Sequence, residues 1–318
     1  MAEDCASLFV TANDGLRLHV SAYGARAAEA MPVVCLPGLA RTSADFDRLA
    51  KTLSADPAQA RYVVALDYRG RGRSDYDRNP MNYNFITELA DLLAVLTALD
   101  LGPAIFVGTS RGGILAMLLA CARPTAIAGV VLNDIGPVIE VQGLARIKSY
   151  VGNLPEPKSY ADGAGILRRL FAAQFPKLSE EDWLAFSRRA FEERDGRLRP
   201  TYDVRLAKTL EGIDLARPLP SLWVEFDALS RVPLMVVRGA NSDVLSTTTV
   251  EAMRARRANL DFVEVPDQGH APLLAEDAII DRIGSFVIVC EQSAGRSNSR
   301  MCRKSGRRFS DKDMRHSK

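Results

Sequence analysis

A serine with a glycine two residues away on each side is the feature of this sequence with the clearest chemical meaning. Residues 108–112 read Gly-Thr-Ser-Arg-Gly, after an apolar run at 104–107 and before an apolar stretch at 112–122. A strand, a sharp turn and a helix in this order expose the hydroxyl of Ser110, because the glycines leave room for the turn. At the helix N-terminus, the backbone N–H of Arg111 and the helix dipole can stabilise an oxyanion. We therefore predict that Ser110 is a nucleophile.

A serine hydroxyl is a weak nucleophile and needs a neighbouring base. The sequence has three histidines. His19 lies in an alternating, strand-like stretch, and His316 lies in the basic C-terminal segment. His270 follows the last strand-like run, at 260–265, in a turn marked by glycine and proline. Since this turn is expected at the sheet edge that also holds Ser110, we predict that His270 is the general base.

A catalytic histidine needs a carboxylate that fixes its tautomer and stabilises its protonated form. Asp243 follows the apolar run at 234–237 and precedes His270 in the chain. The order serine, aspartate, histidine is one of the orders in which such triads occur. Asp134, after the run at 127–132, is the alternative acid, and its other reading is a structural carboxylate. We predict that Asp243 is the acid of the triad.

A second donor to the oxyanion should come from another loop at the same edge. The strand-like run at 32–36 is followed by Pro37, Gly38 and Leu39. Glycine lets the backbone approach a substrate closely. We predict that the backbone N–H groups of Leu39 and Arg111 form the oxyanion hole.

Strand-like runs alternate with helical patterns along the chain. The helical spacing of apolar residues is clear at 84–99, and runs that are apolar on both faces suit parallel strands covered by helices. This alternation predicts the α/β class, with a doubly wound, mostly parallel sheet of about eight strands. The strand-like runs lie at 16–23, 32–36, 61–66, 104–107, 127–132, 234–237 and 260–265.

One connection is much longer than the others. About 100 residues separate the run that ends near residue 132 from the run that starts near residue 232, whereas a strand–helix–strand unit needs about 30. The excess is mostly helical in pattern. We predict a sheet core at 1–135 and 231–290, with a helical cap at 136–230. The alternative is that the insertion forms a second, independent domain.

The sequence resembles the α/β-hydrolase fold superfamily, in the type whose helical cap follows the sixth strand. The resemblance covers residues 33 to about 287, with the motifs in the family's order. One departure is Pro37, which stands where members commonly carry a histidine before the glycine. The matching motifs are Pro37-Gly38-Leu39, the Asp-x-Arg-Gly-x-Gly-x-Ser pattern at 67–74, the serine motif at 108–112, the segment 239–243 and Gly269-His270.

The resemblance also implies an activity. Members that use aspartate as nucleophile are dehalogenases and epoxide hydrolases, whereas Ser110 implies a serine hydrolase that forms an acyl-enzyme intermediate. We expect the substrate to be a small carboxylic ester. The alternatives are a thioester, a lactone, or a carbon–carbon bond of a ring-fission product, and, outside the enzymes, a binding protein on the same fold. With no metal-ligand spacing and no phosphate-binding glycine pattern, we expect no cofactor and no metal.

The cap is expected to shape the substrate pocket. Its aromatic residues could line the pocket or form the core of the cap. The side chain of Arg111 could hold a carboxylate near the site, or it could be solvated and pair with a cap residue. The aromatic candidates are Tyr150, Tyr160, Phe171, Phe175, Trp183, Phe186, Phe191, Trp223 and Phe226.

The charge is distributed unevenly between body and tail. Residues 291–318 hold nine basic and three acidic residues and carry +6, so residues 1–290, with 32 basic and 36 acidic residues, carry −4. A body at −4 lacks the basic face of a nucleic-acid-binding domain. The Ser-, Arg- and Lys-rich tail at 291–318 is expected to be disordered.

The same composition bounds the partners and the compartment. The five cysteines are scattered and include no Cys-x-x-Cys pair, and the N-terminus has no basic stretch before an apolar one. We expect a cytoplasmic protein that binds a small acyl substrate and has no nucleic-acid or membrane partner. The sequence leaves a homodimer open.

Overall fold

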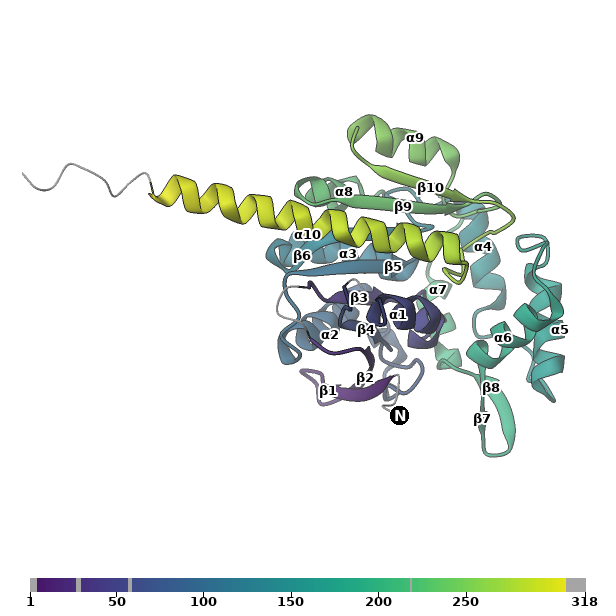
Figure 1. Ribbon diagram of the computed structural model, residues 1–318. Helices are drawn as coiled ribbons and strands as arrows, with labels where there is room; N and C mark the ends of the chain where they lie inside the picture. The colour runs from purple at the N-terminus through teal and green to yellow at the C-terminus, as the bar shows by residue number, and fades with distance from the viewer. Residues whose placement is uncertain (1–4, 27–29, 57–58, 218, 307–318) are drawn as a thin grey trace, which may run out of the picture.

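The apolar runs of the sequence form the centre of one eight-stranded sheet in the computed structural model (Figure 1). The structure describes residues 5–26, 30–56, 59–217 and 219–306. The strand order is β1-β2-β4-β3-β5-β6-β9-β10. The strands are β1 (Ala6–Thr11), β2 (Arg17–Tyr23), β3 (Val33–Leu36), β4 (Val63–Leu66), β5 (Ala104–Thr109), β6 (Ile127–Asn133), β9 (Leu234–Gly239) and β10 (Asp261–Val265).

From β4 to β10 the sheet is parallel, whereas β1 pairs with β2 and β2 with β4 in antiparallel fashion. The prediction of a doubly wound, mostly parallel sheet of about eight strands is therefore confirmed. The strand-like runs of the sequence did not include β1, an edge strand whose residues are largely exposed. Because an exposed edge strand needs no continuous apolar run, its sequence gives a weak signal.

Alternate residues of each central strand face two different apolar cores. On β3, for example, Val34 and Leu36 belong to one core, and Val33 and Cys35 belong to the other. Residues of α2, α3 and α9 pack into the first core, and residues of α1 and α10 into the second. These helices are α1 (Asp47–Ser54), α2 (Phe85–Ala98), α3 (Arg111–Ala122), α9 (Thr247–Arg256) and α10 (Asp277–Gly306).

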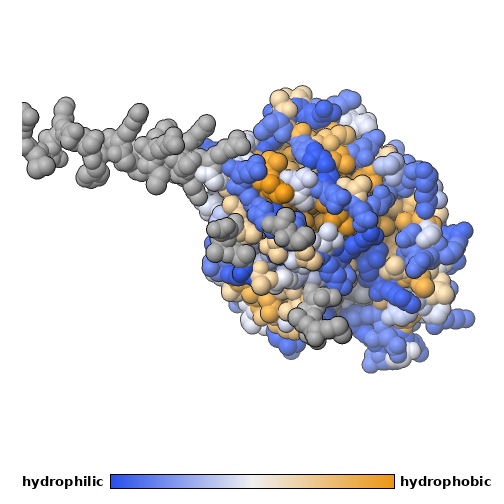
Figure 2. All heavy atoms as spheres, in the orientation of Figure 1, coloured by the Kyte–Doolittle hydropathy of each residue, from blue (hydrophilic) through white to orange (hydrophobic). Residues whose placement is uncertain are grey.

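Most of the long connection between β6 and β9 forms a layer at the end of the sheet where the parallel strands terminate, whereas its last helix packs against α3 (Figure 1). Its α5 and α6 enclose a third apolar core that contains Phe171, Trp183 and Phe186. On the face shown in Figure 2, hydrophilic residues cover much of this layer, as expected when its aromatic side chains turn inward. Its elements are α4 (Val141–Tyr150), α5 (Tyr160–Phe171), α6 (Glu180–Ala190), β7 (Phe191–Arg194), β8 (Arg197–Pro200), α7 (Lys208–Glu211) and α8 (Trp223–Ala228).

The insertion is less purely helical than the sequence predicted. β7 and β8 form an antiparallel hairpin that turns at Asp195 and Gly196, both with positive φ. Only four residues make up each strand, which is too short for a clear alternating pattern. Residues from α4 and α8, such as Ile147 and Phe226, also pack into the first core of the sheet. The insertion is thus packed onto the sheet through part of its length.

The C-terminal segment begins as a packed helix. The sequence predicted disorder over 291–318, but α10 continues to Gly306, and residues 307–318 lie outside the described part. Apolar residues as far as Cys290 are buried against the sheet, and extending a formed helix needs no new nucleus. Figure 1 shows the end of α10 projecting beyond the body. Within the described residues, no helix combines the length and the apolar content that a membrane span requires.

Candidate active site

Ser110 lies at the sharp turn between β5 and α3. Its backbone has φ 49° and ψ −113°, a conformation that is costly for a residue with a side chain. A Cβ on Gly108 would lie 2.6 Å from the backbone of Gly112, and a Cβ on Gly112 would collide with the carbonyl of Leu36. The two glycines are therefore required by the close approach of β5, α3 and the end of β3, as the sequence predicted.

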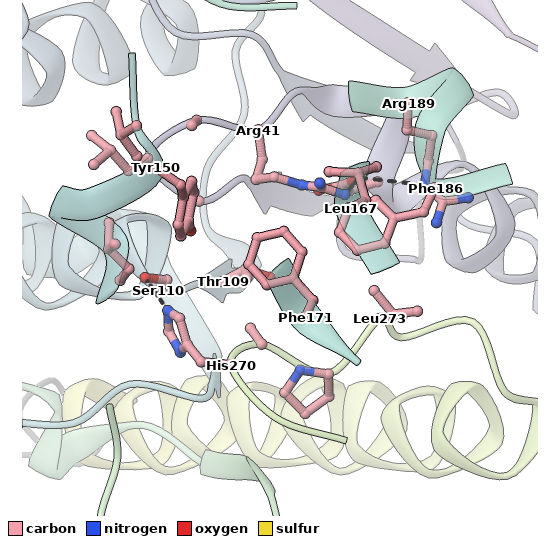
Figure 3. Close-up of a pocket in the computed structure, with 18 of the residues that line it drawn as sticks. Arg41, Thr109, Ser110, Tyr150, Leu167, Phe171, Phe186, Arg189, His270 and Leu273 are labelled. Atoms are coloured by element: carbon pink, nitrogen blue, oxygen red, sulfur yellow. Dashed lines mark hydrogen bonds and ion pairs between the residues drawn. The ribbon is translucent and has the colours of Figure 1, made fainter. Parts of the chain in front are cut away.

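His270 contacts both the serine and a carboxylate. Its Nε2 lies 2.9 Å from the Oγ of Ser110, and its Nδ1 lies 2.7 Å from the Oδ2 of Asp134. The hydrogen-bond pattern is satisfied when Nδ1 carries the proton and Nε2 accepts from the serine hydroxyl. Figure 3 shows the Ser110–His270 contact at one end of the cavity. The side chain of His270 is 6% exposed, and that of Asp134 is fully buried.

Asp134, and not Asp243, is hydrogen-bonded to His270. Asp134 follows β6, the strand next to the one that carries Ser110. Its Oδ1 accepts the backbone N–H of Gly239 at 2.9 Å, and its Oδ2 accepts the hydroxyl of Ser242 at 2.6 Å. With the His270 contact, this buried carboxylate takes part in three hydrogen bonds.

Asp243 binds Arg146 of the insertion. The prediction that Asp243 is the hydrogen-bond partner of His270 is therefore corrected. Its two carboxylate oxygens accept from Nε and Nη2 of Arg146, at 2.6 and 2.8 Å. Burial opposes ionisation of Asp243, but the hydrogen bonds and charge of Arg146 outweigh it, and the pKa of Asp243 is lowered. Arg146 comes from α4 in the insertion, 97 residues earlier in the chain. The spacing of residues along the chain does not reveal this partner.

The two predicted oxyanion donors are free to bind a substrate. Within the described residues, the backbone N–H groups of Leu39 and Arg111 donate to no protein acceptor. The ideal Cβ position on Gly38 lies 3.9 Å from the Cβ of Ser110, so this loop passes close to the nucleophile. The role of these two N–H groups stays a prediction.

A buried ion cluster links the two loops that carry these N–H groups. Nε of Arg71 donates to the carbonyl of Leu39 at 2.9 Å, and Nη1 of Arg71 lies 2.8 Å from Oε1 of Glu88. The other carboxylate oxygen of Glu88 accepts from Nε of Arg111 at 2.5 Å. Arg111 therefore holds a carboxylate of the protein and is neither solvated nor paired with the insertion. Burial opposes ionisation of Glu88, but the charges of Arg111 and Arg71 outweigh it and lower its pKa.

Sequence reasoning missed Arg71 and Glu88 as supports of the site. Arg71 occupies a variable position of the Asp-x-Arg-Gly-x-Gly-x-Ser pattern, and Glu88 lies in the first turn of α2. The only signal was a charged residue on a helix face that is otherwise buried. Both side chains are 0% exposed, which a helical pattern alone does not reveal.

A cavity of about 110 Å³ opens onto Ser110 and His270 (Figure 3). Its wall is mostly apolar and includes Tyr150, Phe171, Phe175 and Phe186 from the insertion, as the sequence proposed for part of the aromatic set. Trp183 shares the third core with Phe171, Phe175 and Phe186 but does not line the cavity. The described residues include no cluster of three or more His, Cys, Asp or Glu side chains that could hold a metal ion.

The fold and the serine–histidine–aspartate contacts define a hydrolase of the α/β-hydrolase class. The alpha/beta hydrolase family model matches residues 33–282, and the chain belongs to this family. The solved structure of an alpha/beta hydrolase from Novosphingobium aromaticivorans is similar, with a TM-score of 0.84 and 38% identity, and the match covers 90% of this chain and 99% of that one.

Two relatives illustrate the range of substrates within the family. The chain is 33% identical to the 3-hydroxybutyrate-oligomer hydrolase of Cupriavidus necator, over 83% of this chain and 91% of the relative. It is 26% identical to the 2-(acetamidomethylene)succinate hydrolase of Mesorhizobium japonicum, over 73% of this chain and 79% of the relative. The family is thus established, and the chain is a hydrolase.

Proposed function

We propose that this protein is a serine hydrolase that cleaves a small carboxylic ester through an acyl-enzyme intermediate. The observation that carries the proposal is the continuous hydrogen-bonded relay from Ser110 through His270 to Asp134. In this proposal Asp134 takes the role that the sequence analysis gave to Asp243. Leu39 and Arg111 keep their predicted role as oxyanion donors.

Acylation uses each of these groups once. The Oγ of Ser110 attacks the acyl carbon while its proton passes to Nε2 of His270. The carbonyl π electrons move onto the oxygen, and the N–H groups of Leu39 and Arg111 donate to the resulting oxyanion. When the tetrahedral intermediate collapses, the bond to the leaving group breaks, and the leaving alcohol takes the proton from His270. Asp134 stabilises the imidazolium form without taking its proton.

Deacylation repeats the sequence with water as the nucleophile. His270 accepts a proton from water as its oxygen attacks the acyl carbon, and the same two N–H groups bind the second oxyanion. Collapse releases the carboxylic acid and returns the proton from His270 to the Oγ of Ser110. The balance needs only water, so no cofactor enters the proposed reaction.

Two observations favour a small ester among acyl bonds. The wall of the cavity beside Ser110 is mostly apolar, which suits the hydrocarbon part of an acyl chain. The Cupriavidus necator relative, at 33% identity, is named for an oligomer of 3-hydroxybutyrate, and hydroxy-acid oligomers are joined by ester bonds. A thioester, a lactone or a ring-fission product would use the same relay.

A panel of nitrophenyl esters with varied acyl length, assayed beside a ring-fission dienoate, tests this proposal. We expect rapid turnover of short esters, and labelling of the wild-type protein by a fluorophosphonate probe. In Ser110→Ala, labelling should vanish and turnover should fall by about 10⁶-fold. Equal labelling of wild type and Ser110→Ala contradicts the proposal. Cleavage of the dienoate with little ester turnover establishes the carbon–carbon hydrolase instead.

A further inference from the structure

Two arginines stand in the wall of an otherwise mostly apolar cavity. Arg41 follows the oxyanion loop, and Arg189 lies in the last turn of α6 in the insertion. Both line the cavity that contains Ser110 and His270. In Figure 3 they lie near Phe186, whereas Ser110 and His270 lie at the other end of the cavity. The cationic groups are thus placed to meet a part of the substrate away from the scissile bond.

Arg41 is held in place and keeps one donor group free. Its Nε and Nη2 bind the two carboxylate oxygens of Asp45, each at 2.5 Å. Its guanidinium carbon lies 4.4 Å from the ring centroid of Phe186. Both contacts fix the plane of the guanidinium group. Its Nη1 makes no hydrogen bond to any residue that the structure describes.

Arg189 is less well compensated. Its one ion pair within the described chain is a 3.5 Å contact from Nε to Asp45, and neither of its Nη atoms has a hydrogen-bond partner there. Burial lowers the pKa of Arg189, and the charge of Arg41 lowers it further, against the opposing effect of Asp45. Asp182 and Asp47 act in the same direction as Asp45, but more weakly than Arg41.

The charges at this end of the cavity do not cancel. Two guanidinium groups face one carboxylate, so the cavity wall carries a surplus of one positive charge. A partly buried cation with unused donors costs stability unless a ligand completes its hydrogen bonds. A guanidinium group presents a planar pair of donors that matches a carboxylate. A surplus of one charge suits a monoanion better than a phosphate dianion.

We propose that Arg41 and Arg189 form a carboxylate-binding subsite, and that the substrate is an ester that bears a free carboxylate group. This inference rests on the proposed ester hydrolysis at Ser110 and adds the chemical class of its substrate. The carboxylate is held by Arg189 and by Nη1 of Arg41, while the ester carbonyl lies at Ser110. The carboxylate can belong to the acyl part or to the leaving alcohol.

Paired substrates test the subsite. One arm compares the mono-nitrophenyl ester of a short dicarboxylic acid with the nitrophenyl ester of the monoacid of equal length. The other arm compares the butyrate ester of a hydroxy acid with the butyrate ester of the matching simple alcohol. The measured quantity is the ratio of kcat/KM for the anionic ester to that for its neutral partner. We expect this ratio to exceed one in one arm, which identifies the side that carries the carboxylate.

Arg189→Gln should lower that ratio by about 10- to 100-fold, since a hydrogen bond to a charged group is lost. Arg189→Lys should recover only part of the loss, because it keeps the charge and loses the planar pair of donors. Arg188→Gln is the matched control. Arg188 is the exposed neighbour on α6 and does not line this cavity, so the ratio should stay at the wild-type value.

A binding measurement separates recognition from catalysis. In the Ser110→Ala background, calorimetry should show that the anionic ester binds more tightly than the neutral one, and that adding Arg189→Gln removes the difference. The thermal midpoint of Arg189→Gln should be no lower than that of the wild type, because a poorly paired charge is removed. A purely structural arginine would instead show a lower midpoint and an unchanged ratio.

The two proposals fail in different ways. An unchanged anionic-to-neutral ratio in Arg189→Gln, with ester turnover that depends on Ser110, overturns the subsite alone. A ratio below one in both arms for the wild-type protein also overturns it. Ester turnover that persists in Ser110→Ala overturns the proposed function, whatever the ratio.

Discussion

At the scale of single residues, the main question is which carboxylate supports His270. Asp134 touches Nδ1 of His270 and is fully buried, whereas both oxygens of Asp243 are occupied by Arg146. Among the described residues, His270 makes its carboxylate hydrogen bond to Asp134 and none to Asp243. The two aspartates therefore have separate tasks, one at the histidine and one at the insertion.

Substituting the two aspartates distinguishes these tasks. We expect Asp134→Asn to lower kcat by about 10⁴-fold, because an amide at this place favours the wrong tautomer of the histidine. Asp243→Asn should lower kcat by less than about tenfold, since Asp134 keeps its hydrogen bond to His270 in this variant. Steady-state kinetics on a nitrophenyl ester measures both, and circular dichroism checks that each variant is folded. A larger loss in Asp243→Asn than in Asp134→Asn is the contrary result.

At the scale of elements, Glu88 on α2 joins the loop after β3 to the start of α3. Its carboxylate lies between Arg71, which binds the carbonyl of Leu39, and Arg111, which follows the nucleophile. Because these contacts are buried, they restrain the backbone at Leu39 and at Arg111, whose N–H groups are the proposed oxyanion donors. Glu88 is thus a positioning residue that acts through the backbone of its neighbours.

Removing the charge of Glu88 should affect both stability and turnover. We expect Glu88→Gln to lower the free energy of unfolding by about 3–5 kcal/mol at neutral pH, because two buried arginines lose their counter-ion. The turnover number should fall as well, with a smaller change in KM, since the donors act mainly in the transition state. Chemical denaturation and ester kinetics measure the two effects. Glu225→Gln on α8, outside this cluster, is the control and should change neither.

The same substitution has a predictable pH dependence. The pKa of Glu88 in the folded protein is lowered from its usual value of 4.5, so its contribution to stability is present above about pH 4.5. That contribution is lost as the pH falls through the lower, folded-state pKa. The stability gap between the wild type and Glu88→Gln should therefore shrink in acid. A gap that widens as the pH falls argues against the ionised state of Glu88.

At the scale of the whole molecule, the sheet, the insertion and the C-terminal helix contribute unequally to the site. The sheet supplies Ser110, Asp134 and His270, and the insertion supplies most of the aromatic wall. The start of α10 packs into the second core, and Glu291 binds the backbone N–H of Met31 and the side chain of Arg61.

Truncation of the chain tests this division. Ending the chain after Gly295 removes nearly all of the basic tail, and we expect an unchanged thermal midpoint and unchanged ester turnover at low and high salt. Ending it after Val289 also removes Cys290 and Glu291, which should lower the thermal midpoint because a buried side chain and an ion pair are lost. A loss of activity, or a changed salt dependence, in the chain that ends after Gly295 would give the tail a function.

The features that the sequence predicted correctly are those that depend on neighbouring residues. The turn at Ser110 and the alternation of strands and helices follow from steric limits and apolar spacing within a few residues. The hairpin of β7 and β8 and the helical continuation of α10 were missed because short strands and helix ends carry weak local signals. The choice between Asp134 and Asp243 depended on a residue of the insertion.

The sequence by itself therefore determined the fold class, the strand–turn–helix around Ser110 and the histidine in the last loop. These features depend on glycine positions and on apolar periodicity, which are properties of short sequence segments. Only the tertiary structure decided that Asp134 meets His270, that Glu88 ties two loops together, and that Arg41 and Arg189 face one cavity. Each of these contacts joins side chains from different elements of the fold, so its geometry exists only after those elements have packed together.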